Sequence, residues 1–237
     1  MKIALCISGF MRGFNSNFIS LKQYLIDINP EIHIFINTWN YIDFDNFQGI
    51  NENEIKNLYN PKKIVIEKPF QLPTHQLMID KNPEKLRNIN NVLSMFYKIN
   101  KCNELKCEYE KENNFKYDCV IRFRSDINLT SRIIIDKSKL NNINIPMYGD
   151  FAGLNDQLAF SNSDNMNIYC NLYNRIVEYL TIENTYLCMK PELFLKFHIE
   201  HNNLKLNRPL INYDLIRLNG QILNNKTREI EYGYISV

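Results

Sequence analysis

The chain of 237 residues is long enough for one large α/β domain, with 45% hydrophobic and 23% charged residues, which is ordinary for a globular protein. Its formal net charge of +2, without any block of like charges, argues against nucleic acid or an anionic membrane as a partner. The six cysteines are scattered and form no CxxC pair, which argues against zinc, so we expect reduced, buried thiols.

The first apolar run, residues 2–7, predicts a buried β-strand that ends at Ser8-Gly9. The run is too short to span a membrane, and no signal-type cleavage segment follows it. We therefore expect a cytoplasmic protein without a membrane span, which would act in the host cytoplasm if its source is viral.

Further along the chain, short apolar runs alternate with longer helical patterns, as is typical of βα units around a parallel sheet. Residues 69–83 contain three prolines and few periodic apolar residues, so they predict a loop. The helix after this loop carries an apolar stripe at helical spacing. In chain order the predicted elements are a helix at 17–28, a strand at 32–36, a helix at 53–59, a strand at 63–67, a long helix at 84–111, strands at 117–123, 133–135, 143–147 and 158–161, and helices at 164–179 and 191–199.

The tail alternates weakly over residues 229–235, which favours a closing strand. No internal repeat and no linker rich in serine or glycine interrupts the pattern. The sequence therefore predicts an α/β fold in a single domain over residues 1–237, with a mostly parallel central sheet flanked by helices.

The strongest local signal is Arg122, Arg124 and Asp126, at the end of the strand predicted for residues 117–123. In an extended strand these three side chains share one face. Open α/β sheets bind ligands outside the carboxyl ends of their strands, and arginine suits bidentate recognition of phosphate. The three residues indicate either a diphosphate site or an Arg–Asp ion pair on an edge strand.

Two other strand ends offer weaker signals. The segment from Ser8 and Gly9 to Arg12 matches neither the dinucleotide fingerprint nor the P-loop, so it is either a nucleotide seat or a plain βα turn. The segment of Asn37, Thr38 and Trp39 contains the only tryptophan, which either stacks on a base or sugar or, more commonly, anchors the core.

Two later segments contain candidate catalytic or metal-binding groups. Residues 149–157 combine two glycines and two aspartates, a composition that turn formation alone explains, although a carboxylate such as Asp156 can act as a general base there. His198 lies near a helix end, where a surface histidine is commoner than the metal ligand it could also be.

Taken in order, five segments resemble a known family. They are Lys2-Ile-Ala-Leu-Cys-Ile-Ser-Gly9, Ile34-Phe-Ile-Asn-Thr-Trp39, Ser94-Met-Phe-Tyr-Lys-Ile99, Tyr117-Asp-Cys-Val-Ile-Arg-Phe-Arg-Ser-Asp126 and Asn155-Asp-Gln-Leu-Ala-Phe160. The ordered set, over residues 1–201, resembles small GT-A-like glycosyltransferases from bacterial surface-polysaccharide clusters and large DNA viruses. The resemblance implies a Rossmann-like sheet with a nucleotide-sugar at its carboxyl edge.

The resemblance also implies roles for individual residues. Asp126 occupies the place of the metal-binding carboxylate, for Mn²⁺ or Mg²⁺, and His198, singled out above for its place on the helix, is the candidate for a further ligand. Arg124 stands where the family pattern has its first Asp, so Arg122 and Arg124 could neutralise the diphosphate and make the cation dispensable. Donor-binding roles are implied for three further groups: Ser8, Gly9 and Arg12; Asn37, Thr38 and Trp39; and Ser94, Tyr97 and Lys98.

These roles imply a glycosyltransferase that moves a sugar from a nucleotide-sugar to a glycan or other hydroxyl acceptor, with Asp156 as the base that deprotonates the acceptor. Two alternatives stay open at this point. One is a nucleotidyl- or phosphotransferase on a similar sheet, and the other is a non-catalytic protein that binds a sugar or nucleotide. The sequence indicates nothing about the oligomeric state.

Overall fold

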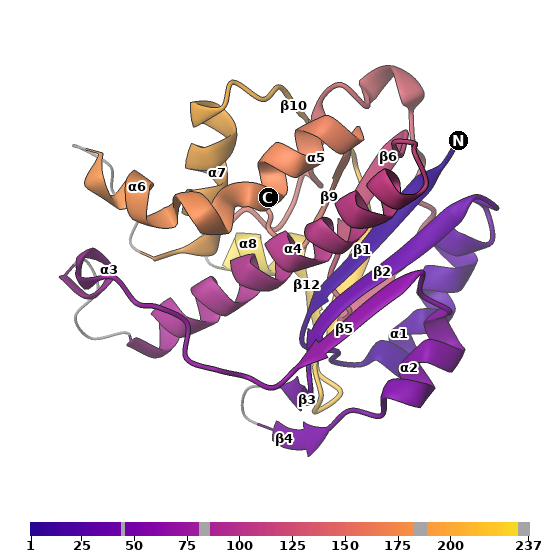
Figure 1. The fold of residues 1–237 in the computed structure, drawn as a ribbon, viewed down its shortest axis with the longest axis horizontal. Coiled ribbons are helices and arrows are strands. Elements are labelled where there is room, and N and C mark those ends of the chain that lie inside the picture. The colour runs from indigo at the N-terminus through magenta and orange to yellow at the C-terminus, as the bar shows by residue number, and fades with distance from the viewer. Residues whose placement is uncertain (44–45, 81–85, 183–188, 232–237) are drawn as a thin grey trace.

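The structure is a computed structural model that describes residues 1–43, 46–80, 86–182 and 189–231 (Figure 1). A seven-stranded sheet forms its centre. From one edge to the other, the strands are β5 (Lys63–Glu67), β2 (Ile32–Trp39), β1 (Ile3–Gly9), β6 (Cys119–Phe123), β9 (Leu158–Ser161), β8 (Ile143–Asn144) and β10 (Leu206–Asn207).

Parallel pairing dominates this sheet, which confirms the predicted α/β fold. Strands β5, β2, β1 and β6 all run in the same direction. Strand β9 is antiparallel to both β6 and β8, and β10 runs parallel to β8. The parallel strands are nearly continuous apolar runs because both faces of the sheet are covered.

Helices cover one face of the sheet, as Figure 1 shows for α4, which crosses in front of the strands. This layer contains α3 (Gln76–Asp80), α4 (Leu86–Glu112), α5 (Ser163–Cys170), α6 (Ile176–Thr181) and α7 (Pro191–His201). Ala4 and Cys6 of β1 point into it and pack in one apolar cluster with Phe96 and Ile99 of α4. The small side chains of β1 therefore let α4 lie close to the sheet.

The opposite face packs against a mixed layer. It consists of α1 (Phe14–Leu21), α2 (Glu52–Tyr59) and a second sheet with the order β12 (Ile222–Asn224), β11 (Tyr213–Ile216) and β7 (Ile127–Leu129). Ile3, Leu5 and Ile7 of β1 point into this layer and pack with Leu21 and Leu215. Alternate side chains of β1 thus pack into two separate hydrophobic cores, one on each face of the sheet.

The remaining elements are short. They are the antiparallel pair β3 (Tyr41–Asp43) and β4 (Asn46–Gly49), helix α8 (Asn225–Glu231), a π-helical turn at Lys22–Ile26 that continues α1, and 3₁₀ segments at Lys137–Lys139 and Asn171–Arg175.

Several predicted elements differ from the structure. Residues 133–135 form no strand, since Ile133 is buried while Ile134 is 82% exposed and no neighbouring strand pairs with them. The helix predicted at 164–179 is interrupted by the asparagine-containing 3₁₀ segment between α5 and α6. The loop predicted at 69–83 contains α3, and its residues 81–83 lie outside the described residues.

The predicted closing strand at 229–235 is wrong over residues 229–231, which belong to α8, and residues 232–235 lie outside the described part of the chain. The strand predicted at 143–147 pairs only over β8. Among the residues that the structure describes, no helix combines the length and the apolar character needed to cross a membrane.

Candidate functional site

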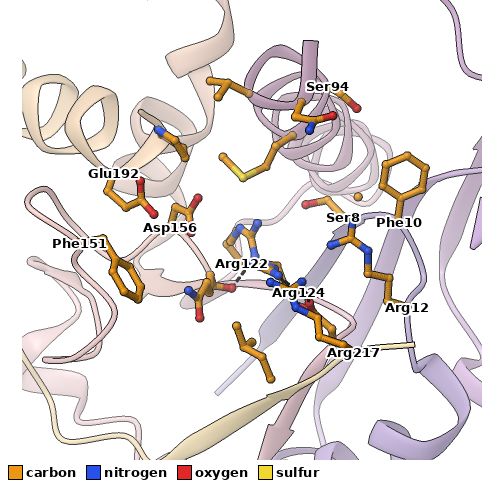
Figure 2. Close-up of a pocket in the computed structure, with 18 of the residues that line it drawn as sticks. Ser8, Phe10, Arg12, Ser94, Arg122, Arg124, Phe151, Asp156, Glu192 and Arg217 are labelled. Carbon is orange, nitrogen blue, oxygen red and sulfur yellow. Dashed lines mark hydrogen bonds and ion pairs between the residues drawn. The ribbon is translucent and has the colours of Figure 1, made fainter. Parts of the chain in front are cut away.

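A cavity of about 380 Å³ opens at the carboxyl ends of β1 and β6 (Figure 2). After β1 the chain adds β2 and β5 on one side of β1 and then crosses to form β6 on the other side. The order of strands therefore reverses between β1 and β6, and such switch points are where open α/β sheets bind ligands. The topology alone makes this cavity the first candidate for a functional site.

Two turns form the floor of the cavity, and hydrogen bonds join them. The turn after β6 contains Arg124, Ser125 and Asp126, and it closes with a hydrogen bond from the Ile127 amide to the Arg124 carbonyl at 3.2 Å. The Ser125 hydroxyl donates to the carbonyl of Phe10, in the turn after β1, at 2.6 Å. Because β6 ends at Phe123, the predicted single strand face with Arg122, Arg124 and Asp126 is replaced by a strand end and a turn.

Five arginines from four separate parts of the chain line the cavity, as Figure 2 shows for four of them. They are Arg12 after β1, Arg122 and Arg124 at the end of β6, Arg217 after β11 and Arg228 in α8. Three carboxyl groups line it as well, those of Asp126, Asp156 and Glu192. The described lining therefore has a local excess of positive charge, although the net charge of the whole chain is small.

Asp126 is the counter-ion of two of these arginines. Its Oδ1 accepts from Arg124 Nε at 2.9 Å, and its Oδ2 accepts from Arg124 Nη2 at 2.6 Å and from Arg217 Nη1 at 3.2 Å. Burial alone would raise the pKa of this carboxyl, but the Arg124 guanidinium outweighs burial and the pKa is lowered. Asp126 is therefore ionised, and both of its oxygens are engaged.

Arg122 and Arg12 are held by other partners. Arg122 is 1% exposed, and its Nη1 donates to the backbone carbonyl of Gln157. Burial lowers the pKa of Arg122. Arg12 Nη2 donates to Asp43 Oδ1 at 2.5 Å. These contacts fix the orientation of the two guanidinium groups.

Asp156 and Glu192 lie together on the wall opposite Arg12 and Arg217 (Figure 2). Asp156 is 4% exposed, and within the described part of the chain its carboxylate has no hydrogen bond or ion pair. Glu192 lies in the first turn of α7, directly after Pro191. Burial and then the neighbouring Asp156 carboxylate raise the pKa of Glu192 to about 8, so its carboxyl is mostly protonated at neutral pH.

The loop before β9 brings Asp156 to the cavity, and polar contacts fix its shape. Phe151 and Ala152 have left-handed backbone conformations, with φ of 42° and 75°, which cost energy in non-glycine residues. The Glu229 carboxylate of α8 compensates by accepting hydrogen bonds from the amides of Asp150 and Phe151. The strained turn places the Phe151 ring in the lining of the cavity.

Nine of the residues predicted from the sequence to form the site do line this one cavity. They are Ser8, Gly9, Arg12, Trp39, Ser94, Arg122, Arg124, Asp126 and Asp156. Trp39 and Ser94 are joined by a hydrogen bond from the indole Nε1 to the serine Oγ at 2.8 Å, and Trp39 is 2% exposed. The tryptophan is therefore a buried anchor that also contributes to the lining of the cavity.

Four other predicted donor-binding residues, Asn37, Thr38, Tyr97 and Lys98, lie outside the lining. Lys98 is fully buried, and its Nζ donates to Asn37 Oδ1 at 2.8 Å, the Thr38 carbonyl at 3.0 Å and Glu67 Oε2 at 2.5 Å. Tyr97 stacks on Trp39 and donates to Glu67. These four residues join α4 to the ends of β2 and β5, which is a structural arrangement.

His198 is not brought together with Asp126, contrary to the predicted pair of metal ligands. It lines a different cavity, and both ring nitrogens have partners, the Tyr179 hydroxyl and the Ile168 carbonyl, each at 2.7 Å. Burial lowers the pKa of His198 to about 4. The imidazole is therefore a neutral hydrogen-bonding group of the helical layer.

The residues at Asp126 do not fit the divalent cation that the glycosyltransferase resemblance implies. Mn²⁺ and Mg²⁺ need several oxygen ligands, and the oxygens of Asp126 already accept from two arginines. Within the described ranges, no group of three or more His, Cys, Asp or Glu side chains is placed to hold a metal ion.

The sequence analysis assigned no role in the site to Glu192, Arg217, Arg228 or Phe151. Proline and glutamate are ordinary residues in the first turn of a helix, so Glu192 carries no distinct signal. Arg217 follows a strand of only four residues, and Arg228 lies in α8, of which only residues 229–231 fell in a predicted element, the closing strand. One signal that the sequence offered is the short, mostly apolar run Tyr213–Ile216, which directly precedes Arg217 as β6 precedes Arg124.

Together the fold and the cavity define an α/β protein with an arginine-rich pocket at the carboxyl edge of its sheet. The chain belongs to the family described as a domain of unknown function, DUF7796, whose model matches residues 1–188. A comparison with curated proteins gave no match. Glu192, Arg217 and Arg228 follow the matched region, so the cavity is completed by residues outside it.

Proposed function

We propose that this protein is a glycosyltransferase that moves a sugar from a nucleotide-sugar donor to a hydroxyl group of a glycan or another acceptor. One observation supports this function above the others. An arginine cluster faces the Asp156 carboxylate and the Glu192 carboxyl across a cavity at the switch point of the sheet (Figure 2).

The arginine side of the cavity suits a diphosphate. Arg12, Arg124 and Arg217 come from three different segments and converge beside the turns after β1 and β6. Guanidinium groups offer paired donors that match phosphate oxygens, and they stay charged at any physiological pH. Charge that develops on a departing nucleoside diphosphate would be stabilised on this side.

The carboxyl side suits the acceptor. The acceptor hydroxyl oxygen would attack the anomeric carbon of the donor sugar, and its proton would pass to the Asp156 carboxylate, which has no described partner in the protein. The bond from the anomeric carbon to the phosphate oxygen would break, and the nucleoside diphosphate would leave with the bonding electron pair. In this arrangement the arginines and the base would lie on opposite sides of the reacting carbon.

The rival enzymatic class is less well supported. Nucleotidyl- and phosphotransferases ordinarily position their phosphates with divalent cations, and the residues around Asp126 do not fit one. A carboxylate in the cavity without a hydrogen-bond partner among the described residues favours a proton-transfer role over simple ligand binding.

Purified protein incubated with UDP-, GDP- or dTDP-sugars and a mixture of glycan acceptors should release free nucleoside diphosphate, which chromatography detects. Replacing Asp156 by Asn should lower the rate of release by about 10²–10⁴-fold, since general bases contribute that much, while donor binding persists. Release of pyrophosphate, or no binding of any nucleotide-sugar in calorimetry, would contradict the function.

A matched pair of variants separates the pocket from general charge effects. Arg217→Gln removes one guanidinium from the cavity, and Arg132→Gln removes one from an exposed position outside the lining. Only the Arg217 substitution should weaken donor binding. Equal effects of the two would mean that diffuse charge, and not this cavity, attracts the nucleotide.

A further inference from the structure

We infer that the arginine cluster binds the diphosphate without a divalent cation, and that Asp126 is a positioning residue for Arg124 and Arg217 and not a metal ligand. This inference rests on the proposed function, because it concerns how the same cavity holds the donor. It differs from what the resemblance to GT-A-like enzymes implies, in which a carboxylate at this position binds the cation.

The contacts of Asp126 are the first step. Arg124 occupies both carboxylate oxygens in a bidentate pair, at 2.9 and 2.6 Å, and Arg217 adds a third donor at 3.2 Å. The Asp126 side chain is only 3% exposed. Three of the roughly four lone-pair sites of the carboxylate are thus occupied, and a cation at the remaining one would lie against two guanidinium groups.

The charges around Asp126 are the second step. The pKa of Arg217 is lowered, first by burial and then by repulsion from Arg124. Arg12 and Arg228 add to this repulsion, and the attraction of Asp126 does not outweigh it. The guanidinium groups of Arg12, Arg124 and Arg228 therefore repel that of Arg217. An incoming anion relieves their repulsion, whereas an incoming dication increases it.

The positions of the other carboxyl groups are the third step. Asp156 and Glu192 lie on the far wall, and Glu192 is mostly protonated at neutral pH, so they do not complete a set of ligands around Asp126. The arginines replace the cation as the counter-charge of the diphosphate. Asp126 holds two of them in place while keeping its own charge neutralised.

Calorimetry with UDP, GDP and dTDP, in excess EDTA and in excess Mn²⁺, tests the inference. For the nucleotide that binds, the Kd in the two conditions should agree within about threefold. Binding that requires Mn²⁺, or that Mn²⁺ tightens by more than about tenfold, overturns the inference but leaves the proposed function standing. Binding of none of the three in either condition overturns both.

Asp126→Asn tests the positioning role, since the amide keeps one acceptor oxygen for Arg124 but loses the charge that a cation needs. If Asp126 positions the arginines, the substitution changes the Kd by the same factor in EDTA and in Mn²⁺. If Asp126 binds the metal, the loss appears in Mn²⁺ alone. Arg217→Gln should weaken binding about tenfold or more in both conditions, and Arg132→Gln should leave it unchanged.

Discussion

At the scale of single residues, the ion pair of Arg124 and Asp126 links the stability of the protein to its site. Its two side chains are 18% and 3% exposed, and Arg217 shares the same carboxylate. A buried charge that loses its partner is strongly destabilising, whereas an exposed pair contributes little. The pair therefore has to be tested for its effect on stability as well as on binding.

Asp126→Ala should lower the free energy of unfolding by about 3 kcal/mol, because it leaves two guanidinium groups without their counter-ion. Urea unfolding followed by circular dichroism measures this change. The control is Asp164→Ala, which removes an ion pair with Lys116 whose side chains are 70% and 65% exposed and should cost less than about 1 kcal/mol. Equal losses in the two variants would contradict the burial argument.

The raised pKa of Glu192 leads us to expect an unusual dependence of stability on pH. Burial and then Asp156 raise its pKa from 4.5 to about 8, so between these values the folded protein binds a proton that the unfolded chain releases. The stabilisation of the folded state by this bound proton is fully present below pH 4.5 and is lost as the pH rises through 8. The Glu192→Gln variant should accordingly lose less stability between pH 5 and pH 8 than the unmodified protein does, as measured by thermal unfolding at several pH values.

The control for this prediction lies on the same helix. Glu200 is exposed near the end of α7, so Glu200→Gln should show the same pH profile as the unmodified protein. If Glu192→Gln also keeps that profile, the carboxyl of Glu192 is ionised over the whole range from pH 5 to pH 8, and the folded protein binds no extra proton there.

The sequence predicted part of each side of the cavity and missed the rest for a physical reason. Arg122, Arg124 and Asp126 follow an apolar strand, where charged residues are costly unless they are paired or functional. Asp156 was found in a loop rich in Asn, Asp and Gly. Glu192 has an unremarkable local setting, and only the packing of α7 against that loop gives it a buried acidic neighbour.

At the scale of elements, the position of α7 depends on a close backbone contact. A Cβ atom at residue 153 would overlap the backbone of Glu192 and Leu193, and the Leu154 amide donates to the Glu192 carbonyl at 3.0 Å. The glycine thus lets the loop and the first turn of the helix meet. Both elements supply carboxyl groups to the cavity, so their distance sets the geometry of the acceptor side.

Gly153→Ala should therefore displace the start of α7, costing about 1–3 kcal/mol of stability as in other overpacked sites. Sugar transfer should fall in the same variant, as measured by release of nucleoside diphosphate. In Gly49→Ala the nearest atom would be the Asn40 carbonyl oxygen at 3.9 Å, an ordinary contact, so stability should change by less than about 0.5 kcal/mol. Wild-type stability and activity in Gly153→Ala would contradict the proposed contact.

The predicted elements succeeded where local pattern and tertiary role agree. The strands at 63–67 and 158–161 were predicted with the bounds that the structure gives, because apolar runs bounded by polar residues mark buried strands. The two-residue strand β10 and the strand β11, whose apolar run is interrupted by Asp214, were missed. Such strands exist only because a distant partner pairs with them, so a local pattern does not reveal them.

At the scale of the whole molecule, the arginine cluster is assembled from residues far apart in the chain. Arg12 and Arg217 are separated by most of the sequence, and the second sheet brings them together by pairing β11 with β7, next to the turn that contains Asp126. The family match at residues 1–188 covers the central part of the sheet, while β11 and α8 lie beyond it. Residues outside the matched region can therefore tune what the cavity binds.

Because a ligand that binds only the folded state adds to its stability, an anion in this cavity should stabilise the entire fold. At one hundred times its Kd, a nucleoside diphosphate should add about 2.7 kcal/mol. For a chain of this size, that gain corresponds to a rise in Tm of about 5–10 °C, which differential scanning fluorimetry measures. Arg217→Gln should reduce the rise at the same ligand concentration, and Arg132→Gln should not. A nucleoside without phosphates that gave the same rise would show that the cavity recognises the base or ribose, and the assignment of the arginine cluster to the diphosphate would fail.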